Sequence, residues 1–256
     1  MDDILRQLKE GAVEQGKLAL DSTLKFNCRK GISCFNTCCG ELDIFLTPYD
    51  VIRMKSRLGK TSLDFLEEHT EVVTLKKTNL PLVKLKMGED RRCRFVTPEG
   101  CSIYSDRPVA CRYYPLGFGA LVDRDAQGGD FYFLIREDHC KGFGGDREWT
   151  VRQWRDDQGI GAYDEVNKDW VDIVLKKKIR GDFEPDEKSL RMFFMASYDI
   201  DSFRAFVFGS RFLDIFDLDE VTVGAIQTED AALLKFALRW LKYVLFKEPT
   251  VALKGT

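Results

Sequence analysis

Eight cysteines are the residues of this chain whose type and spacing can do chemistry. All of them lie within residues 28–140, and residues 141–256 contain none. Thiols that served only as small core residues would be spread more evenly, and thiolates are preferred ligands of zinc and of iron–sulfur clusters. The clustering therefore predicts a metal site in the N-terminal half. The candidate ligands are Cys28, Cys34, Cys38, Cys39, Cys93, Cys101, Cys111 and Cys140.

The first group has the spacing Cys28-x5-Cys34-x3-Cys38-Cys39. Ligands a few residues apart let one tight loop wrap a metal centre. Adjacent side chains point in different directions, so Cys38 and Cys39 cannot both bind one mononuclear ion without strain. Either they serve two different centres, or one of them packs as an ordinary thiol.

The second group has the spacing Cys93-x7-Cys101-x9-Cys111, which is too long for a zinc knuckle. Such ligands must come from separate turns. Cys140, which follows His139, is placed to close a coordination shell.

The spacings favour an iron–sulfur cluster of the 4Fe–4S type, with zinc as the alternative. Structural zinc sites usually combine two close pairs, and here only Cys34-x3-Cys38 resembles such a pair. Eight thiolates can hold two four-cysteine centres. Six ligands together with two cysteines that bind no metal would account for the number of cysteines equally well. The strongest candidates are Cys34, Cys38, Cys39, Cys93, Cys101 and Cys111, with Cys28 and Cys140 next.

Basic residues beside the cysteines are candidates for tuning the site. Arg107 and Arg112 can offset the negative charge of a thiolate-ligated cluster or donate to its sulfurs. Ion pairing with Asp106 or Glu99 is an equally supported alternative. His139 is a candidate ligand or hydrogen-bond donor.

Local signals predict the elements that position these residues. Thr47, Pro48 and Asp50 are typical of a helix start, and we expect a helix to Leu58 that ends at Gly59. Alternation and β-branched content predict strands, and helical spacing predicts further helices. The predicted strands are 71–75, 80–87 and 131–135, and the predicted later helices are 162–178, 186–195, 202–212 and 228–246.

These elements predict an α+β protein. We expect an amphipathic helix over residues 1–20, a cysteine-rich metal-binding domain with a small sheet over 21–145, and a mainly helical region over 146–256. The chain of 256 residues is long enough for one large domain or two small ones.

Composition narrows the class of protein. The net charge of −3 gives no electrostatic case for nucleic-acid binding, which usually needs a basic face. No apolar run approaches the ~18 residues of a membrane span, and the first residues lack the pattern of a secretory signal. We therefore expect a cytoplasmic, reducing compartment, where disulfides are rare.

Several segments together resemble the YkgJ-type cysteine-cluster family, also called the CxxCxxCC or zinc- and iron-chelating domain. The resemblance covers roughly residues 26–145. The matching segments are CFNTCCG at 34–40, LTPYDV at 46–51, CRF at 93–95, GCSIY at 100–104, RPVACRYYP at 107–115 and CKGFG at 140–144. The family's opening cysteine spacings are usually two residues, whereas here they are five and three. The resemblance implies iron or zinc binding, and one branch of the family contains flagellin lysine N-methylases.

The leading functional hypothesis is an iron–sulfur protein in electron transfer or in redox-dependent modification of another protein, so that a protein is the expected partner or substrate. One alternative is a zinc-binding structural or interaction module without catalysis. Another alternative is an enzyme similar to protein lysine N-methyltransferases. It rests on the resemblance alone, because we identify no residue in this chain that would catalyse methyl transfer. Whether the chain is an enzyme is left open.

Overall fold

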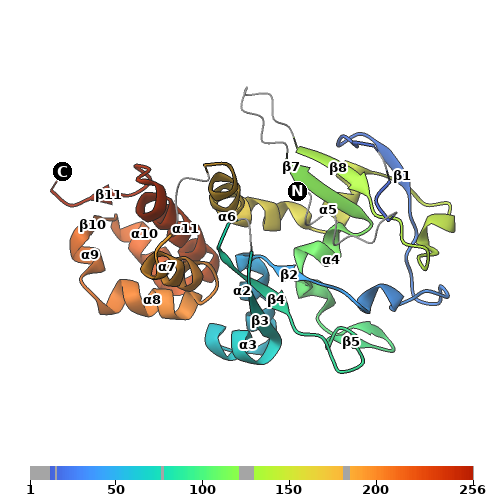
Figure 1. Ribbon diagram of the computed structural model, residues 1–256, viewed down its shortest axis with the longest axis horizontal. Helices are drawn as coiled ribbons and strands as arrows, with labels where there is room; N and C mark the ends of the chain where they lie inside the picture. Colours follow the sequence, from blue (N-terminus) through green and yellow to red (C-terminus); the bar gives the residue numbers. More distant parts are fainter. Residues whose placement is uncertain (1–11, 15, 76–77, 121–129, 181–184, 256) are drawn as a thin grey trace. The chain divides into compact units, whose positions relative to one another are not determined.

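The computed structural model describes residues 12–14, 16–75, 78–120, 130–180 and 185–255, and the chain is an α+β protein (Figure 1). A cysteine-rich N-terminal domain precedes a helical C-terminal region, as predicted. The helix expected over 1–20 lies mostly outside the described residues. Its described part, 12–14 and 16–20, contains no helix and makes the bridges Val13–Ile135 and Leu18–Tyr132 instead. None of the described helices is long and apolar enough to cross a membrane.

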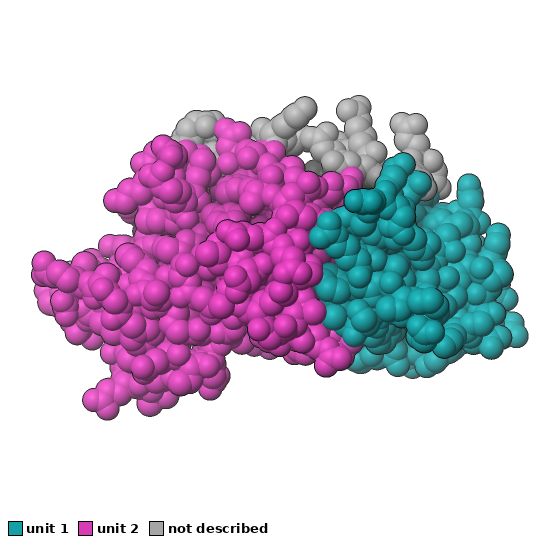
Figure 2. Space-filling model, turned by 90° about the horizontal axis from the view of Figure 1, so that it is seen from below, with its two compact units in different colours: residues 1–42, 87–104, 109–161 teal, residues 43–86, 105–108, 162–256 magenta. Residues whose placement is uncertain are grey.

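The chain forms two compact units, each built from segments that alternate along the sequence (Figure 2). Unit 1 consists of Met1–Leu42, Met87–Tyr104 and Val109–Gly161. Unit 2 consists of Asp43–Lys86, Ser105–Pro108 and Ala162–Thr256. The domain boundaries drawn from the sequence, 21–145 and 146–256, stay predictions.

Short antiparallel strand pairs and short helices build unit 1. The pairs in its described residues are β1 (Thr23–Lys25) with β9 (Glu148–Thr150), β7 (Leu116–Ala120) with β8 (Asp130–Leu134), and β5 (Val96–Thr97) with β6 (Gly100–Cys101). The helical segments are η1 (Thr37–Cys39), α4 (Val109–Tyr113), η3 (Gly142–Gly144) and α5 (Val151–Asp157). A 3-10 turn, η2 (Tyr104–Asp106), crosses the boundary between the units.

An aromatic core holds unit 1 together. Phe26 makes edge-to-face contacts with Tyr114, Phe143 and Trp154, at ring-centroid distances of 6.0, 5.1 and 5.5 Å. The indole N–H of Trp149 donates to the carbonyl of Phe26 at 2.9 Å, and that of Trp154 donates to Tyr113 at 3.2 Å. Buried indole groups need such partners. Because Phe26 and Tyr113 each lie two residues from a cysteine, the core fixes the chain beside Cys28 and Cys111.

Gly142 makes this core possible, because a side chain at its position would meet the Phe26 ring. A Cβ there would lie 2.5 Å from Phe26 Cε2, whereas a Cβ at Gly144 would meet nothing within 4 Å. We expect Gly142→Ala to destabilise the protein by about 1–3 kcal/mol, the usual cost of overpacking a core. Gly144→Ala is the matched control and should leave the urea midpoint nearly unchanged. Equal midpoints for the two variants would contradict this account of Gly142.

In unit 2, a three-stranded antiparallel sheet packs with helices whose ends follow the local sequence. The strand order is β2 (Phe45–Leu46), β4 (Pro81–Leu85), β3 (Thr70–Thr74). Helix α2 (Pro48–Leu58) begins with a capping box between Thr47 and Asp50 and ends at Gly59 with φ of 64°. Helix α3 (Ser62–His69) is capped by Thr61. The start and end predicted for α2 are confirmed.

The rest of unit 2 is mainly helical. Its elements are α6 (Ile160–Arg180, whose first two residues belong to unit 1), α7 (Glu187–Ser197), α8 (Ile200–Gly209), α9 (Phe212–Ile215), α10 (Glu220–Thr228), α11 (Asp230–Phe246) and the strand pair β10 (Phe216–Asp217) and β11 (Ala252–Leu253). The predicted helix 202–212 is wrong at its end, because α8 stops at Gly209 and α9 is separate. The predicted helix 228–246 is wrong at its start, because Thr228 ends α10 and α11 begins at Asp230 without a side-chain cap from Glu229.

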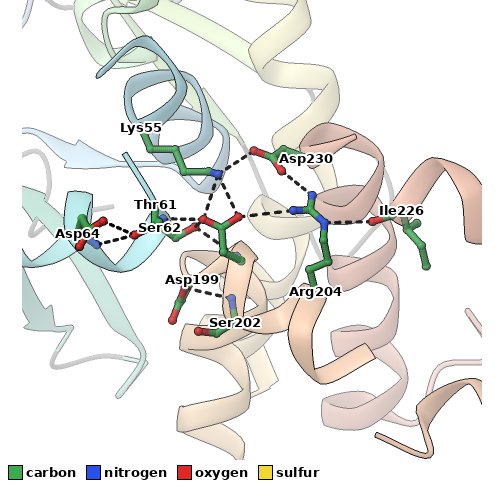
Figure 3. A network of polar contacts seen from close by, with 10 residues as sticks. Lys55, Thr61, Ser62, Asp64, Asp199, Ser202, Arg204, Ile226 and Asp230 are labelled. Atoms are coloured by element: carbon green, nitrogen blue, oxygen red, sulfur yellow. Dashed lines mark hydrogen bonds and ion pairs between the residues drawn. The ribbon is translucent and has the colours of Figure 1, made fainter. Parts of the chain in front are cut away.

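A network of charged side chains joins four helices of unit 2 (Figure 3). Lys55 of α2 has a side chain only 8% exposed, and its Nζ lies 2.9 Å from Asp230 of α11 and 3.2 Å from Asp201 of α8. The backbone N–H of Ser62 in α3 donates to Asp201 at 2.7 Å. Arg204 of α8 donates to Asp230 at 2.5 Å. A buried ammonium needs such partners to be tolerated, so this network fixes how the four helices pack.

Candidate metal centre

All eight cysteines lie in unit 1, and all are free thiols. Their side chains come from loops and from short elements rather than from one helix or sheet. The carriers are the loop after β1 (Cys28 and Cys34), η1 (Cys38 and Cys39), the bridge with residue 87 (Cys93), β6 (Cys101), α4 (Cys111) and the turn before η3 (Cys140).

Four of these thiols, Cys28, Cys34, Cys38 and Cys140, are neighbours and are called the Cys28 quartet here. The thiol of Cys28 interacts electrostatically with those of the other three. The backbone N–H of Lys141 donates to the sulfur of Cys34 at 3.2 Å, which brings the chain after Cys140 to the first loop. Cys28 is exposed, whereas the other three are half-buried.

The remaining four thiols form a second group, the Cys39 quartet. Cys39 interacts electrostatically with Cys111, Cys93 and Cys101, and Cys93 interacts with Cys101. The backbone N–H of Cys93 donates to the carbonyl of Cys39 at 2.8 Å, so these two segments run side by side. The β5–β6 hairpin carries Cys101 back beside the turn that begins at Cys93.

The two quartets meet at the dipeptide Cys38–Cys39. These side chains belong to different quartets but still touch, because the S–H of Cys38 donates to the sulfur of Cys39. The loop before them is held by Asn36, which has φ of 67° and donates from Nδ2 to Thr97 at 2.9 Å. Arg92 donates to the carbonyl of Asn36 at 3.1 Å. One 3-10 turn thus presents a thiol to each quartet.

The surroundings of three thiols, those of Cys28, Cys38 and Cys93, favour the protonated form. Burial, and then the neighbouring Cys38, Cys140 and Cys34, raise the pKa of Cys28 to about 11. The hydrogen bond to Cys39, followed by burial, raises the pKa of Cys38, and the same hydrogen bond lowers the pKa of Cys39. Burial also raises the pKa of Cys93, although N–H groups of Phe95 and Val96 donate to its sulfur and oppose the shift. A bound cation reverses this balance, because it deprotonates the thiols that coordinate it. The donor set therefore fits a cationic centre.

The described side chains do not form a preformed site for a single metal ion. Within the described residues, which include every cysteine, no three Cys, His, Asp or Glu side chains are arranged to hold one metal ion. A closed zinc site would need four ligands at about 2.0–2.3 Å from one ion.

Polar side chains next to the Cys28 quartet were partly missed by the sequence analysis. The hydroxyl of Tyr114 lies against Cys140, with Glu137 and Cys38 also close. Nε2 of His139 is buried without a hydrogen bond and lies 3.5 Å from the Glu137 carboxylate. The sequence contained one signal for these neighbours, because Glu137 lies only three residues before Cys140.

The roles predicted for the two arginines stay predictions. Nη1 of Arg112 donates to the carbonyl of Gln158 at 2.7 Å. Arg107 is buried and belongs to unit 2, so its role towards the cysteines stays a prediction. Asp106, suggested as an ion-pair partner, accepts from Nε of Arg53 at 2.9 Å.

Comparison with known proteins identifies the segment that holds these thiols. Residues 27–141 match the model of the CxxCxxCC family, described as a zinc- or iron-chelating domain. The comparison with curated proteins and the comparison with solved structures find no match. The matched segment contains every cysteine of the chain. This segment is therefore similar to the zinc- or iron-chelating domains of that family.

Proposed function

We propose that this protein binds two iron–sulfur clusters, one in each quartet, and uses them for electron transfer or for redox-dependent modification of another protein. Cys28, Cys34, Cys38 and Cys140 are the proposed ligands of one cluster, and the Cys39 quartet provides those of the other. When bound, such clusters supply one-electron oxidation and reduction.

The division of eight thiols into two sets of four carries this proposal. A 4Fe–4S cluster takes four cysteine thiolates, and each quartet offers four without sharing a residue. Adjacent residues, Cys38 and Cys39, belong to different quartets. Because electron exchange slows steeply with distance, two clusters joined at one dipeptide would exchange electrons rapidly.

A four-iron cluster places a less strict demand on its ligands than a single zinc ion does. Each thiolate of a four-iron cluster bonds a different iron, so the sulfurs need not meet at one point. The irregular sequence spacings support the same choice, because structural zinc sites usually combine close pairs. Zinc remains the alternative, since the family description covers both metals.

Groups of this chain are positioned to stabilise thiolates. Amide N–H groups of Lys141, Phe95 and Val96 donate to cysteine sulfurs. Such hydrogen bonds favour the charged thiolate and tune a cluster's potential. We propose that the partner is a protein that exchanges electrons with the exposed Cys28 side, and that the protein works in a reducing compartment such as the cytoplasm, where eight free thiols persist.

The test is spectroscopic and uses the full chain purified without oxygen. Iron–sulfur clusters give a brown protein whose broad visible absorbance bleaches on chemical reduction and yields a paramagnetic signal. We expect all three properties. A colourless protein that contains zinc and no sulfide would overturn the proposal in favour of a structural zinc module.

A further inference from the structure

The hydroxyl of Tyr114 is an unsatisfied polar group at the edge of the candidate metal centre. Its oxygen is buried and has no hydrogen-bond partner. An unsatisfied buried hydroxyl costs about 1–3 kcal/mol, and such groups in native structures call for an explanation. Tyr114 directly follows α4, three residues after Cys111.

The ring of Tyr114 is fixed by packing. It makes an edge-to-face contact with Phe26 at 6.0 Å and packs against the aromatic core of unit 1, as Cys140 and Phe143 also do. Its hydroxyl is directed at the sulfur of Cys140, although the contact falls short of hydrogen-bond geometry. A tyrosine hydroxyl is protonated at neutral pH and able to donate.

We infer that Tyr114 is a positioning residue that donates a hydrogen bond to the Cys140 thiolate and raises the reduction potential of the cluster in the Cys28 quartet. This inference rests on the proposed iron–sulfur function. A thiolate is a stronger acceptor than the thiol, so the hydroxyl gains its partner when the centre is loaded. Reduction adds negative charge to the cluster, and a hydrogen bond to a ligating sulfur stabilises that charge.

The inference predicts that the reduction potentials of the two clusters respond differently to the loss of the Tyr114 hydroxyl. The cysteines that interact with the Tyr114 hydroxyl, Cys140 and Cys38, both belong to the Cys28 quartet, whereas backbone N–H groups of Phe95 and Val96 donate to Cys93 in the Cys39 quartet. The cluster beside Tyr114 should therefore respond alone when the hydroxyl is removed. A hydroxyl that donated to Glu137 instead would leave both potentials unchanged.

The test is Tyr114→Phe in the full chain, with iron and sulfide measured before a potentiometric titration followed by electron paramagnetic resonance. Losing one hydrogen bond to a charged sulfur should disfavour the reduced cluster about tenfold, which is about 59 mV for one electron. We expect wild-type metal content, one potential lowered by this amount and the other unchanged. The paramagnetic signal whose potential is lowered should be the signal that Cys38→Ser removes.

Tyr113→Phe is the matched control, because the Tyr113 hydroxyl accepts from Arg155 at 3.0 Å and lies outside the quartet. It should change neither potential. Full loading with both potentials unchanged in Tyr114→Phe would overturn the inference. If that variant fails to load, replacing tyrosine throughout by the more acidic 3-fluorotyrosine strengthens the donor and should raise the same potential, and no rise would overturn the inference. Wild-type protein without iron and sulfide would instead overturn the proposed function itself.

Discussion

Cys38→Ser should remove one cluster and leave the other, and Cys39→Ser should do the reverse. Each substitution takes one thiolate from a different quartet, although the two residues are adjacent. Because four thiolates hold a 4Fe–4S cluster, the loss of one ligand should empty or weaken that site alone. About half of the wild-type iron and sulfide should remain in each variant.

The spectra of a wider set of variants give this prediction its control. Cys28→Ser and Cys140→Ser should reproduce the paramagnetic spectrum of Cys38→Ser. Cys93→Ser and Cys111→Ser should reproduce that of Cys39→Ser. If the Cys38 and Cys39 variants have the same spectrum and lose the same metal, the division into two quartets is incorrect.

Loss of metal should also weaken the fold of unit 1. Metal binding and folding are coupled at such sites, because the unfolded chain does not hold the ligands together. Variants that lose a cluster should therefore unfold at lower urea concentration than the loaded protein. A cysteine whose replacement changes neither metal content nor midpoint is removed from the ligand set.

Lys55→Ala should give the largest loss of stability outside the metal centre. The Lys55 side chain is 8% exposed and balances Asp201 and Asp230, whose side chains are 34% and 22% exposed. Removing it leaves two carboxylates facing each other with Arg204 as their remaining cation in the network. Breaking a buried ion pair by removing one partner costs about 3–5 kcal/mol, and we expect the lower end because the acids are partly exposed.

Lys235→Ala is the matched control for this lysine. Lys235 also pairs with a carboxylate, that of Glu165, but their side chains are 47% and 71% exposed. Surface pairs contribute about 0–1 kcal/mol, so this variant should be almost as stable as wild type. Urea unfolding followed by circular dichroism measures both. Similar losses in the two variants would mean that the Lys55 network does not stabilise unit 2.

The Lys55 network also predicts how stability depends on pH. Burial raises the pKa of Asp201 and Asp230, but hydrogen bonds from Ser62 and Arg204 and the charge of Lys55 outweigh it, so both pKa values lie below the usual range. The stability that these carboxylates contribute is present above their unfolded pKa of about 3.9. It is lost as the pH falls through the lower folded pKa. The stability difference between wild type and Lys55→Ala should therefore shrink below about pH 4. A difference that stays constant on acidification would contradict this origin.

Local sequence signals were sufficient for the fold class and for helix ends with strong caps. The Thr47–Asp50 capping box and Gly59 fix α2 by short-range hydrogen bonds and backbone conformation, which a sequence displays directly. The predicted helix 202–212 overran the break between α8 and α9, although Gly209 and Ser210 interrupt the apolar pattern there. Which segments form one unit depends on tertiary packing. Boundaries drawn along the sequence assume continuous domains, so they could not describe two units whose segments alternate along the chain.

The candidate site was predictable in its residue types but not in its grouping. Cysteine counts and spacings gave the eight candidates and left open whether Cys38 and Cys39 serve two centres or one of them packs as an ordinary thiol. Which cysteines group with Cys38 and which with Cys39 follows only from the fold. Cys28 and Cys140, for example, are far apart in the sequence but are neighbours in the structure. The role inferred for Tyr114 follows only from the fold, which places its buried, unsatisfied hydroxyl beside Cys140.

The most direct test of the central claim is the content of iron, zinc and acid-labile sulfide per chain in protein purified without oxygen. Two four-cysteine clusters predict about eight irons and about eight sulfides per chain, with all cysteines used. About four of each would reduce the account to one cluster. Zinc without sulfide would contradict it, because the quartets would then hold structural ions.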